Sequence, residues 1–255
     1  MPYSAVIFDV DGVLVDSPHE IAWRQTLDEL MQTSWADIKR STTYTPDRFD
    51  TSLYQTRVAG KPRQTGALAV LEYFHVPDPA ARAVEYAREK QKKLVDLIEH
   101  GQFHVFPDAR RFVLDCVEAA IPIAAASSSK NARQLLASIP IDGPPSSSTK
   151  TLLDLFSADV SGRDVAHGKP APDIFLEAAR ELHVCPDHCV VIEDAVSGVA
   201  AAKSGGMFAI GVARLQDDAE LAAAHADLVV QSLDEVNRNA FGRGMIEFTP
   251  QSSNT

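Results

Sequence analysis

The sequence predicts an α/β protein whose parallel sheet is interrupted, after its first strand, by a helical segment. Short continuous apolar runs alternate with helical patterns, which is typical of parallel strands joined by helical crossovers. The stretch 18–101 lacks such runs and contains only helical patterns. The length of 255 residues is long for one compact domain, and a domain with a large insertion accounts for it.

The predicted strands are continuous apolar runs, two of which end in an acid, as expected for strands covered on both faces. They are 5–9, 121–126, 189–193, 207–212 and 228–230. Helical patterns follow three of them at 130–138, 197–203 and 219–224. This alternation predicts a Rossmann-like parallel sheet core.

The inserted segment is predicted to be an α-helical cap with helices near 19–32, 64–74 and 80–98. The last of these is charged on one face, and its predicted buried side consists of Val84, Ala87, Leu94, Val95 and Ile98. We therefore expect a core domain from 1–16 and 102–240, a cap domain at 17–101 and a tail at 241–255. Residues 140–150 are expected to form a loop, and 251–255 a frayed end.

Charge and cysteine content restrict the classes of partner. The chain carries 24 Lys and Arg against 35 Asp and Glu, a net charge of −11 that disfavours nucleic acid and anionic membranes as partners. The three cysteines, at 116, 185 and 189, form no CxxC pair and fit a reducing compartment. Because there is neither a signal-peptide pattern nor an apolar stretch of about 18 residues, we expect a cytoplasmic protein. We also expect a monomer.

Two acids follow the first predicted strand in the motif FDVDGVLVDS. Asp9 and Asp11 stand two residues apart, a spacing that turns both side chains to one side of an extended backbone. They would emerge at the carboxyl edge of the sheet, where open α/β folds bind ligands. Crowded carboxylates need a cation, and oxygen ligands suit Mg²⁺. A solvated Asp-Gly turn is the simpler alternative.

Polar groups also follow two later strands. The second strand is followed by Ser127, Ser128, Ser129, Lys130 and Asn131. These groups could bind an anion at the start of the next helix. The alternative is that one of them merely caps that helix.

Acids and a lysine complete the pattern. Glu193 and Asp194 follow the strand 189–193, where a simple cap is again the alternative. Lys169 lies in a proline-rich loop, KPAPDIF, that leads into a helix, whereas an isolated lysine is more often a surface residue. Parallel strands end at the same edge, so these groups are predicted to converge.

In these four motifs the chain resembles the haloacid dehalogenase superfamily, specifically its β-phosphoglucomutase-like branch. The resemblance spans roughly 6–236 and rests on FDVDGVLVDS, SSSKN, KPAPDIF and EDAVSG. It implies that Asp9 is a nucleophile forming an aspartyl phosphate and Asp11 a general acid and base. It further implies that Ser127 and Lys169 bind the transferring phosphoryl group.

The same resemblance implies a magnesium site and a substrate class. Mg²⁺ would be held by Asp9, the Asp11 backbone carbonyl and Asp194, with help from Glu193. The substrate would be a small phosphorylated sugar, contacted by Ser128, Ser129, Lys130 and Asn131. These are expectations from the family.

Cap residues would determine specificity. Gly60-Lys61-Pro62-Arg63 precedes a predicted cap helix, and Arg63 matches the position that holds a distal phosphate in the branch. The alternative is an exposed arginine at a helix start. His19 is a candidate substrate contact, but it follows Asp16 more closely than is usual in the family, so a helix-start histidine without a catalytic task is equally consistent.

The motifs leave the acceptor of the phosphoryl group open. We expect a β-phosphoglucomutase that converts β-glucose 1-phosphate to glucose 6-phosphate, with a sugar-phosphate or other small-molecule phosphatase as the alternative. Halide release from a 2-haloacid is disfavoured by the second acid, Asp11. A non-catalytic phosphosugar sensor is disfavoured because all the expected catalytic groups are present.

Overall fold

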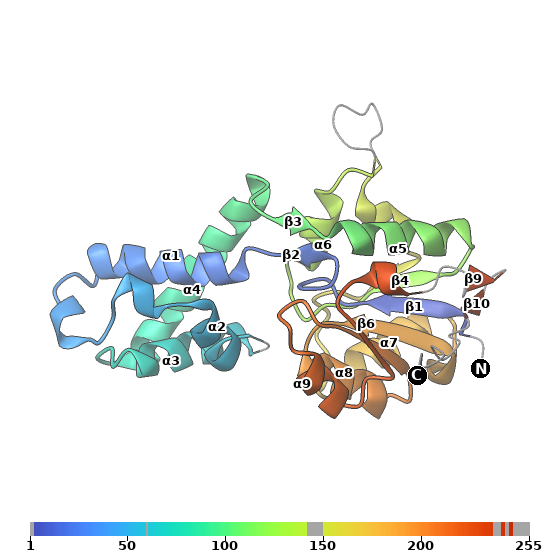
Figure 1. The fold of residues 1–255 in the computed structure, drawn as a ribbon. Coiled ribbons are helices and arrows are strands. Elements are labelled where there is room, and N and C mark those ends of the chain that lie inside the picture. The colour runs from blue at the N-terminus through green and yellow to red at the C-terminus, as the bar shows by residue number, and fades with distance from the viewer. Residues whose placement is uncertain (1–2, 60, 142–149, 237–240, 243–244, 247–255) are drawn as a thin grey trace. The chain divides into compact units, whose positions relative to one another are not determined.

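The computed structural model describes residues 3–59, 61–141, 150–236, 241–242 and 245–246. The chain divides into two compact units, Met1–Asp16 with His104–Thr255, and Ser17–Phe103. The first is an α/β unit and the second is helical (Figure 1). No helix in the described part of the chain is long and apolar enough to cross a membrane.

The α/β unit is built on a six-stranded parallel sheet, which confirms the predicted fold class. Its strand order is β5-β4-β1-β6-β7-β8. The strands are β1 (Ala5–Phe8), β4 (Ile123–Ala125), β5 (Ala158–Asp159), β6 (Cys189–Glu193), β7 (Phe208–Val212) and β8 (Leu228–Val230). The first strand lies in the middle of the sheet because later strands add on both of its sides.

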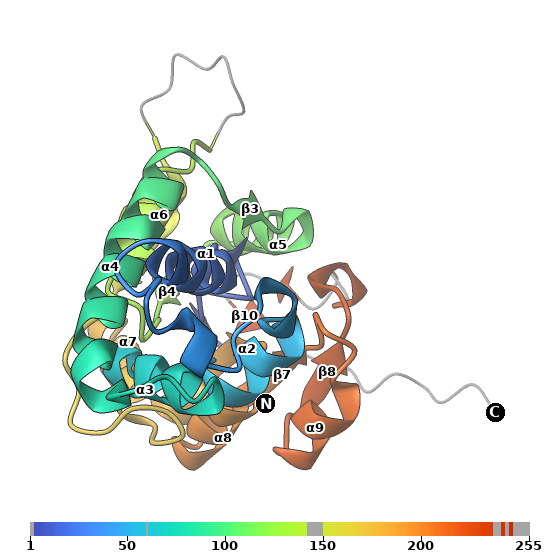
Figure 2. The same ribbon diagram turned by 90° about the vertical axis from the view of Figure 1, so that its left-hand side faces the viewer.

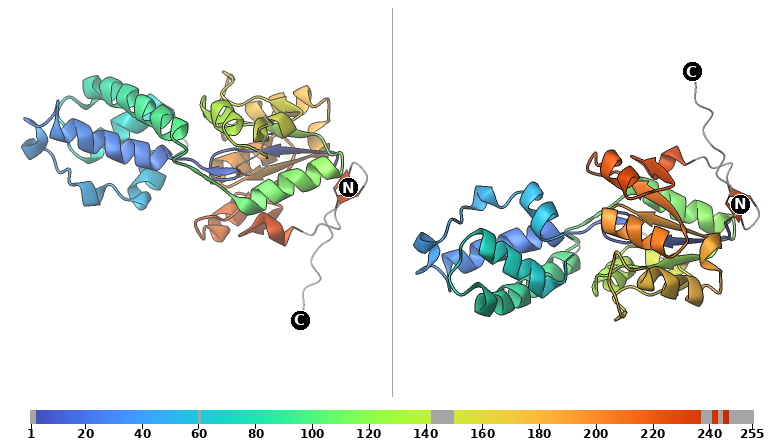
Figure 3. Two further views of the ribbon diagram at one scale, coloured as in Figure 1. Left: turned by 90° about the horizontal axis from the view of Figure 1, so that it is seen from above. Right: turned by 90° about the horizontal axis from the view of Figure 1, so that it is seen from below.

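Alternate residues of the central strands face opposite layers of helices. Ile7 belongs to the core cluster that also contains Phe175 of α7 (Asp173–Glu181) and Val199 of α8 (Val196–Ser204). Phe8 instead packs edge-on against Phe112 of α5 (Pro107–Glu118), with ring centroids 6.0 Å apart. Helices therefore cover both faces, as views from above and below show (Figure 3). Two shorter helices are α6 (Ala132–Ala137) and α9 (Asp218–Ala223).

Short strands complete this unit. β2 (Val15–Asp16) pairs antiparallel with β3 (His104–Val105), and this ribbon contains the segments that lead to and from the helical unit. β9 (Phe241–Gly242) pairs antiparallel with β10 (Met245–Ile246), in the region predicted as a tail. The predicted frayed end at 251–255 and residues 142–149 of the predicted loop lie outside the described residues.

Short 3-10 helices connect several of these elements. They are η1 (Lys39–Ser41), η2 (Pro46–Arg48), η3 (Leu152–Leu155), η4 (Pro186–His188) and η5 (Leu233–Glu235).

The helical unit contains α1 (His19–Gln32), α2 (Thr51–Arg57), α3 (Arg63–Tyr73) and α4 (Pro79–Glu99). α4 packs beside both α1 and α3 (Figure 2). An aromatic core holds them together, and the hydroxyl of Tyr86 donates to the carbonyl of Trp23 over 2.7 Å. Helix α2 has no clear sequence pattern because only Leu53 is buried in it, and it depends on a side-chain cap from Asp50.

The buried face of α4 differs from the prediction. Val84 is 60% exposed and Val95 is only half-buried, whereas Lys90 is 2% exposed. The buried row in fact runs through Ala83, Tyr86, Ala87, Lys90, Leu94, Leu97 and Ile98. These residues recur every three or four positions, as residues on one face of a helix do. Val84 directly follows Ala83 in the sequence and therefore lies beside this face. A lysine among apolar residues at this spacing indicates a buried charge with a partner, because lysine is almost never fully buried without one.

Candidate active site

The ends of three neighbouring strands bring the predicted acids and hydroxyls to one edge of the sheet. Phe8 is in register with Ala125 of β4 and Ile192 of β6. The amide of Asp9 donates to the carbonyl of Ile192 over 3.0 Å, which extends this register past the strand end. Asp9, Ser127 and Glu193 are all buried there.

Lys169 joins two of these groups. Its Nζ donates to Oδ1 of Asp9 over 2.5 Å and to Oε1 of Glu193 over 2.6 Å. The three side chains are only 12%, 8% and 1% exposed. The ammonium also lies 4.8 Å from the ring centroid of Phe175 in α7. The predicted loop lysine is therefore a buried member of the site and not a surface residue.

The site carries more negative charge than this lysine neutralises. Burial raises the pKa of Asp9 to about 7, and the charges of Glu193 and Asp11 add to this effect while Lys169 opposes it. Burial, together with Glu193 and Asp9, also raises the pKa of Asp194. Burial opposes the charge of Lys169, but the carboxylates of Asp9 and Glu193 outweigh it and raise the pKa of the ammonium. A cationic ligand is the natural complement to such a group.

Two glycines make room for the carboxylates. Gly12 has φ +87°, and a Cβ at this position would overlap the carboxylate of Asp194. A Cβ on Gly198 would overlap the carboxylate of Glu193 in the same way. Close approach of backbone and carboxylate at both places therefore requires glycine.

Glu193 has its carboxylate fully engaged within the protein. Besides Lys169, it accepts the backbone N–H groups of Asp194 and Ala195 on Oε2, each over 2.9 Å. These bonds make it an anchor for Lys169 and for the turn after β6. Its predicted part in binding a metal stays a prediction from the sequence.

The serine-rich segment contributes one buried hydroxyl. Ser127 donates to Oδ2 of Asp11 over 3.1 Å and accepts from the amide of Ser129 over 3.0 Å. Ser128 and Lys130 are exposed, Ser129 is half-buried and Asn131 is buried. The ammonium of Lys130 pairs with the exposed Asp164 over 2.8 Å.

Gly162 packs against the segment 127–130, and the sequence analysis did not identify it. Its amide donates to the carbonyl of Ser127 over 2.8 Å. Its φ is +69°, and a Cβ there would lie 2.7 Å from the Cα of Lys130. The Ser-Gly pair directly after β5 is the only local signal, because the contact joins segments about 30 residues apart.

The two predicted cap residues both lie in the helical unit. His19 is the first residue of α1, and its Nδ1 lies 3.0 Å from Nζ of Lys90, which in turn lies 5.0 Å from the ring centroid of Trp23. The histidine is therefore positioned by a buried lysine that the sequence analysis missed.

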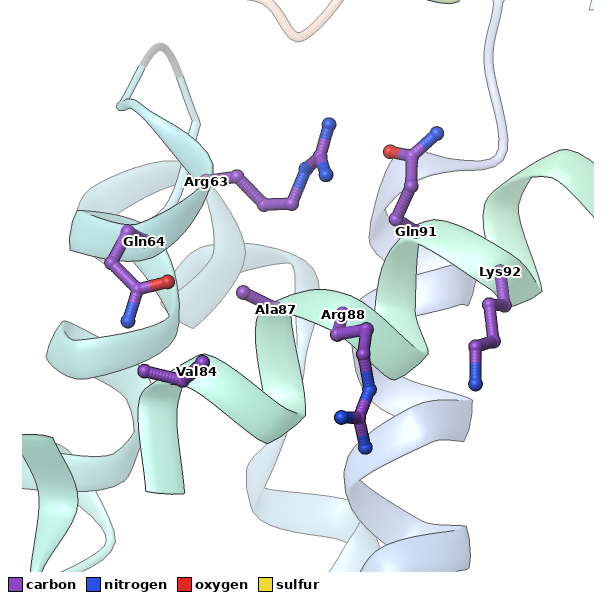
Figure 4. A pocket seen from close by; sticks show the side chains of 7 residues that line it. All are labelled: Arg63, Gln64, Val84, Ala87, Arg88, Gln91 and Lys92. Atoms are coloured by element: carbon purple, nitrogen blue, oxygen red, sulfur yellow. The ribbon is translucent and has the colours of Figure 1, made fainter. Parts of the chain in front are cut away.

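Arg63 begins α3 and lines a hollow of about 500 Å³. The other lining residues are Gln64, Val84, Ala87, Arg88, Gln91 and Lys92. The side chains of Arg63 and Gln91 extend to the same side of this hollow (Figure 4). Arg88 and Lys92 both pair with Glu89, over 2.8 and 2.9 Å, so Arg63 is the candidate contact for an anionic group here. Gly60, the first residue of the predicted motif, lies outside the described residues.

The carboxylates at the sheet edge can supply some, but not all, of the ligands of a magnesium ion. No three His, Cys, Asp or Glu side chains of the described residues are grouped as a ready metal cluster. Mg²⁺ is however commonly bound by one or two carboxylates, with water and substrate phosphate as the other ligands. Asp9 and Asp194 can supply the two carboxylates, and the space above Gly12 admits the second.

Removal of the central cation should destabilise the α/β unit. The substitution Lys169→Met leaves Asp9 and Glu193 buried without their partner, which typically costs about 3–5 kcal/mol. Urea denaturation followed by circular dichroism measures the free energy of unfolding. The matched control is Lys130→Met, since Lys130 and Asp164 form an exposed pair with a far smaller expected loss. Equal losses in the two variants would contradict the central role of Lys169.

Comparison with known proteins agrees with this geometry. The sequence model of the haloacid dehalogenase-like hydrolases matches residues 3–206. The chain is 33% identical over 249 residues to a β-phosphoglucomutase of Mycobacterium bovis, covering 91% of this chain and 90% of the relative. It is 30% identical over 217 residues to a fructose-1-phosphate phosphatase of Escherichia coli, covering 82% and 96%.

Solved structures give the same result. The β-phosphoglucomutase of Pyrococcus sp. strain ST 04 superposes with a TM-score of 0.67 at 29% identity, covering 91% of this chain and 94% of the other. The chain is therefore an enzyme, a phosphotransferase or phosphatase. It belongs to the haloacid dehalogenase-like hydrolase family, in the β-phosphoglucomutase-like branch.

Proposed function

We propose that this enzyme is a magnesium-dependent phosphotransferase that acts on a phosphorylated sugar through an aspartyl phosphate on Asp9. The observation that carries this proposal is the buried Asp9 carboxylate at the end of the central strand, bonded to Lys169 over 2.5 Å. A phosphoryl group bears several negative oxygens, so a carboxylate nucleophile needs such a cation beside it.

The first chemical step forms one bond and breaks one. An Asp9 oxygen attacks phosphorus, and the bond between phosphorus and the sugar oxygen breaks with its electron pair going to that oxygen. Asp11, in its protonated form, gives the departing oxygen its proton. Ser127 and Lys169 bind the phosphoryl oxygens during transfer. Glu193 is a positioning residue, because it holds Lys169 and has no free carboxylate oxygen.

The second step reverses the first with a new acceptor. Asp11, now ionised, removes a proton from the attacking hydroxyl, whose oxygen bonds to phosphorus as the bond to Asp9 breaks. The hydrogen bond that Ser127 donates to Oδ2 of Asp11 over 3.1 Å helps to hold the carboxylate in place for this step.

Asp9, Asp194 and the backbone carbonyl of Asp11 would hold the magnesium ion in this proposal. When bound, Mg²⁺ would neutralise charge on the phosphoryl oxygens. Ser128, Ser129, Lys130 and Asn131 are proposed to contact phosphate or sugar groups, and His19 to contact the sugar.

We further propose that the acceptor is a sugar hydroxyl, so that the enzyme converts β-glucose 1-phosphate to glucose 6-phosphate. Two features support a mutase. The first is the 33% identity to a β-phosphoglucomutase over most of the chain. The second is the hollow beside Arg63, whose forked guanidinium suits the phosphate that is not being transferred.

A phosphatase is the second candidate because a fructose-1-phosphate phosphatase is also a relative over most of its length. A cytoplasmic location, a monomeric state and the absence of nucleic-acid and membrane partners stay predictions from the sequence.

The nucleophile is tested with Asp9→Asn. Turnover of phosphate esters should fall by several orders of magnitude, on the order of 10³-fold or more, because the attacking oxygen is lost. Trapping with acetyl phosphate should label the wild type and not the variant. Asp187→Asn, an exposed aspartate at the opposite end of β6, is the control and should retain activity. Turnover of the Asp9 variant within about tenfold of wild type would exclude it as nucleophile.

The metal is tested by chelation. EDTA should remove activity and excess Mg²⁺ should restore it, because Asp9 and Asp194 share one lysine as their nearby cation. Asp194→Ala should raise the Mg²⁺ concentration needed for half-maximal activity. Undiminished turnover in exhaustively chelated buffer would refute the proposed metal dependence.

The acceptor is tested with Arg63→Ala and a sugar bisphosphate primer. Isomerisation of β-glucose 1-phosphate should fall strongly, on the order of 10²-fold, because an arginine fork that binds phosphate is lost. Slow hydrolysis of p-nitrophenyl phosphate, which has no second phosphate, should be spared. Arg40→Ala, an exposed arginine of the same unit, is the control. Release of free phosphate from every sugar phosphate by the wild type would favour the phosphatase.

A further inference from the structure

Arg214 is a buried cation near the active-site loop that neither the sequence motifs nor the proposed mechanism uses. It follows β7, and its guanidinium makes a forked pair with Asp108, over 2.8 and 3.2 Å. The same guanidinium donates to the carbonyl of Gly12 over 3.4 Å and to that of Val13 over 3.3 Å. The side chains of Arg214 and Asp108 are 14% and 8% exposed.

The carboxylate of Asp108 accepts hydrogen bonds from three residues. It lies in the first turn of α5 and accepts, besides Arg214, the hydroxyl of Ser232 over 3.1 Å and the amide of Leu233 over 2.8 Å. Although burial opposes its charge, Arg214 and the Leu233 amide hold the pKa of this carboxyl below its usual range. Asp108 therefore gives Arg214 a fixed, ionised partner.

The turn that Arg214 contacts is the one that positions Asp11. Within this turn the amide of Gly12 donates to Val15, and the amides of Leu14 and Val15 donate to Val10. Arg214 donates to the carbonyls of Gly12 and Val13, directly after Asp11.

The same guanidinium also contacts the segment that follows β3. It lies 4.1 Å from the ring centroid of Phe106. The amide of Phe106 in turn donates to the carbonyl of Leu14 over 3.0 Å. One side chain thus contacts the turn that precedes β2 and the residue that follows β3.

We propose that Arg214 is a positioning residue that fixes the turn after Asp11, and through it the carboxyl of Asp11. Its planar fork reaches two carbonyls and one carboxylate together, which the single ammonium of a lysine cannot do. The catalytic part of this inference rests on the proposed function, in which Asp11 gives a proton to the departing oxygen.

The main competing explanation is that Arg214 only joins the segment after β7 to α5, through Asp108. The chain contains a second arginine pair on α5 for comparison. Arg111 of α5 makes a forked, more exposed pair with Asp234 of η5 but contacts neither Gly12 nor Val13. Arg111→Lys is therefore the control for an arginine pair that ties α5 to a neighbouring segment without contacting the turn.

The first arm of the experiment is independent of activity. Hydrogen exchange is measured by mass spectrometry on peptides covering 10–16 in the wild type, Arg214→Lys and Arg111→Lys. We expect faster exchange in this segment for Arg214→Lys alone. Phe106→Leu, which removes the ring beside the guanidinium without leaving a charge unpaired, is the second variant should Arg214→Lys not fold. Wild-type exchange of 10–16 in the folded variant would overturn the proposal.

The second arm compares two leaving groups. A sugar phosphate releases an alkoxide that needs a proton from Asp11, whereas p-nitrophenyl phosphate releases a stabilised phenolate that needs little help. In single-turnover measurements of the first step with Arg214→Lys, phosphoryl transfer from the sugar phosphate to Asp9 should slow by at least about tenfold, within the 10²–10⁴-fold contribution of general acid catalysis. The burst of p-nitrophenolate, which reports the same step before Asp11 acts as a base, should keep its rate within about twofold of wild type, because that departure needs little acid catalysis.

The two arms separate the inference from the function on which it rests. Equal losses with both esters would overturn the positioning of Asp11, since a general weakening of the fold affects both reactions. A wild type that turns over neither ester would refute the proposed function, and the exchange arm would still decide whether Arg214 fixes the turn.

Discussion

The ion pair that Lys169 makes with Asp9 and Glu193 is the interaction on which the rest of the site depends. It joins a loop before α7 to the ends of β1 and β6, and it places one positive charge among four nearby acids. Carboxylates at this depth are costly without a partner. The same low exposure that makes them costly strengthens their attraction for a bound cation or for the lysine. The Asp9 carboxylate is thus kept within the core by one cation.

The supports around this pair are mainly backbone features. Gly12 and Gly198 admit the carboxylates of Asp194 and Glu193 where any side chain would collide with them. Gly162 supports the turn that carries Ser127. Gly12 and Gly162 lie in loops and Gly198 lies in the first turn of α8, so the geometry of the charged groups is determined by how closely these segments approach one another.

The two units differ in charge. Residues 17–103 contain twelve basic and twelve acidic residues, so the net charge of −11 lies entirely in the α/β unit. This unit must nevertheless bind a negatively charged phosphoryl group in the proposed mechanism, which makes a local cluster of cations necessary. In the helical unit, Arg63 lines a hollow in which Arg88 and Lys92 both pair with Glu89, and the proposed function assigns the second anionic group to Arg63.

The sequence by itself determined the fold class and the residues of the sheet edge, because apolar runs and their polar ends are local patterns. It did not reveal β5, which has two residues, or the burial of Lys90 in place of Val84. Only the tertiary structure decided that Glu193 anchors Lys169, and that Arg214 reaches Asp108 from 106 residues away. These contacts join side chains distant along the chain, and their partners are selected by the packing of strands and loops, which no local pattern records.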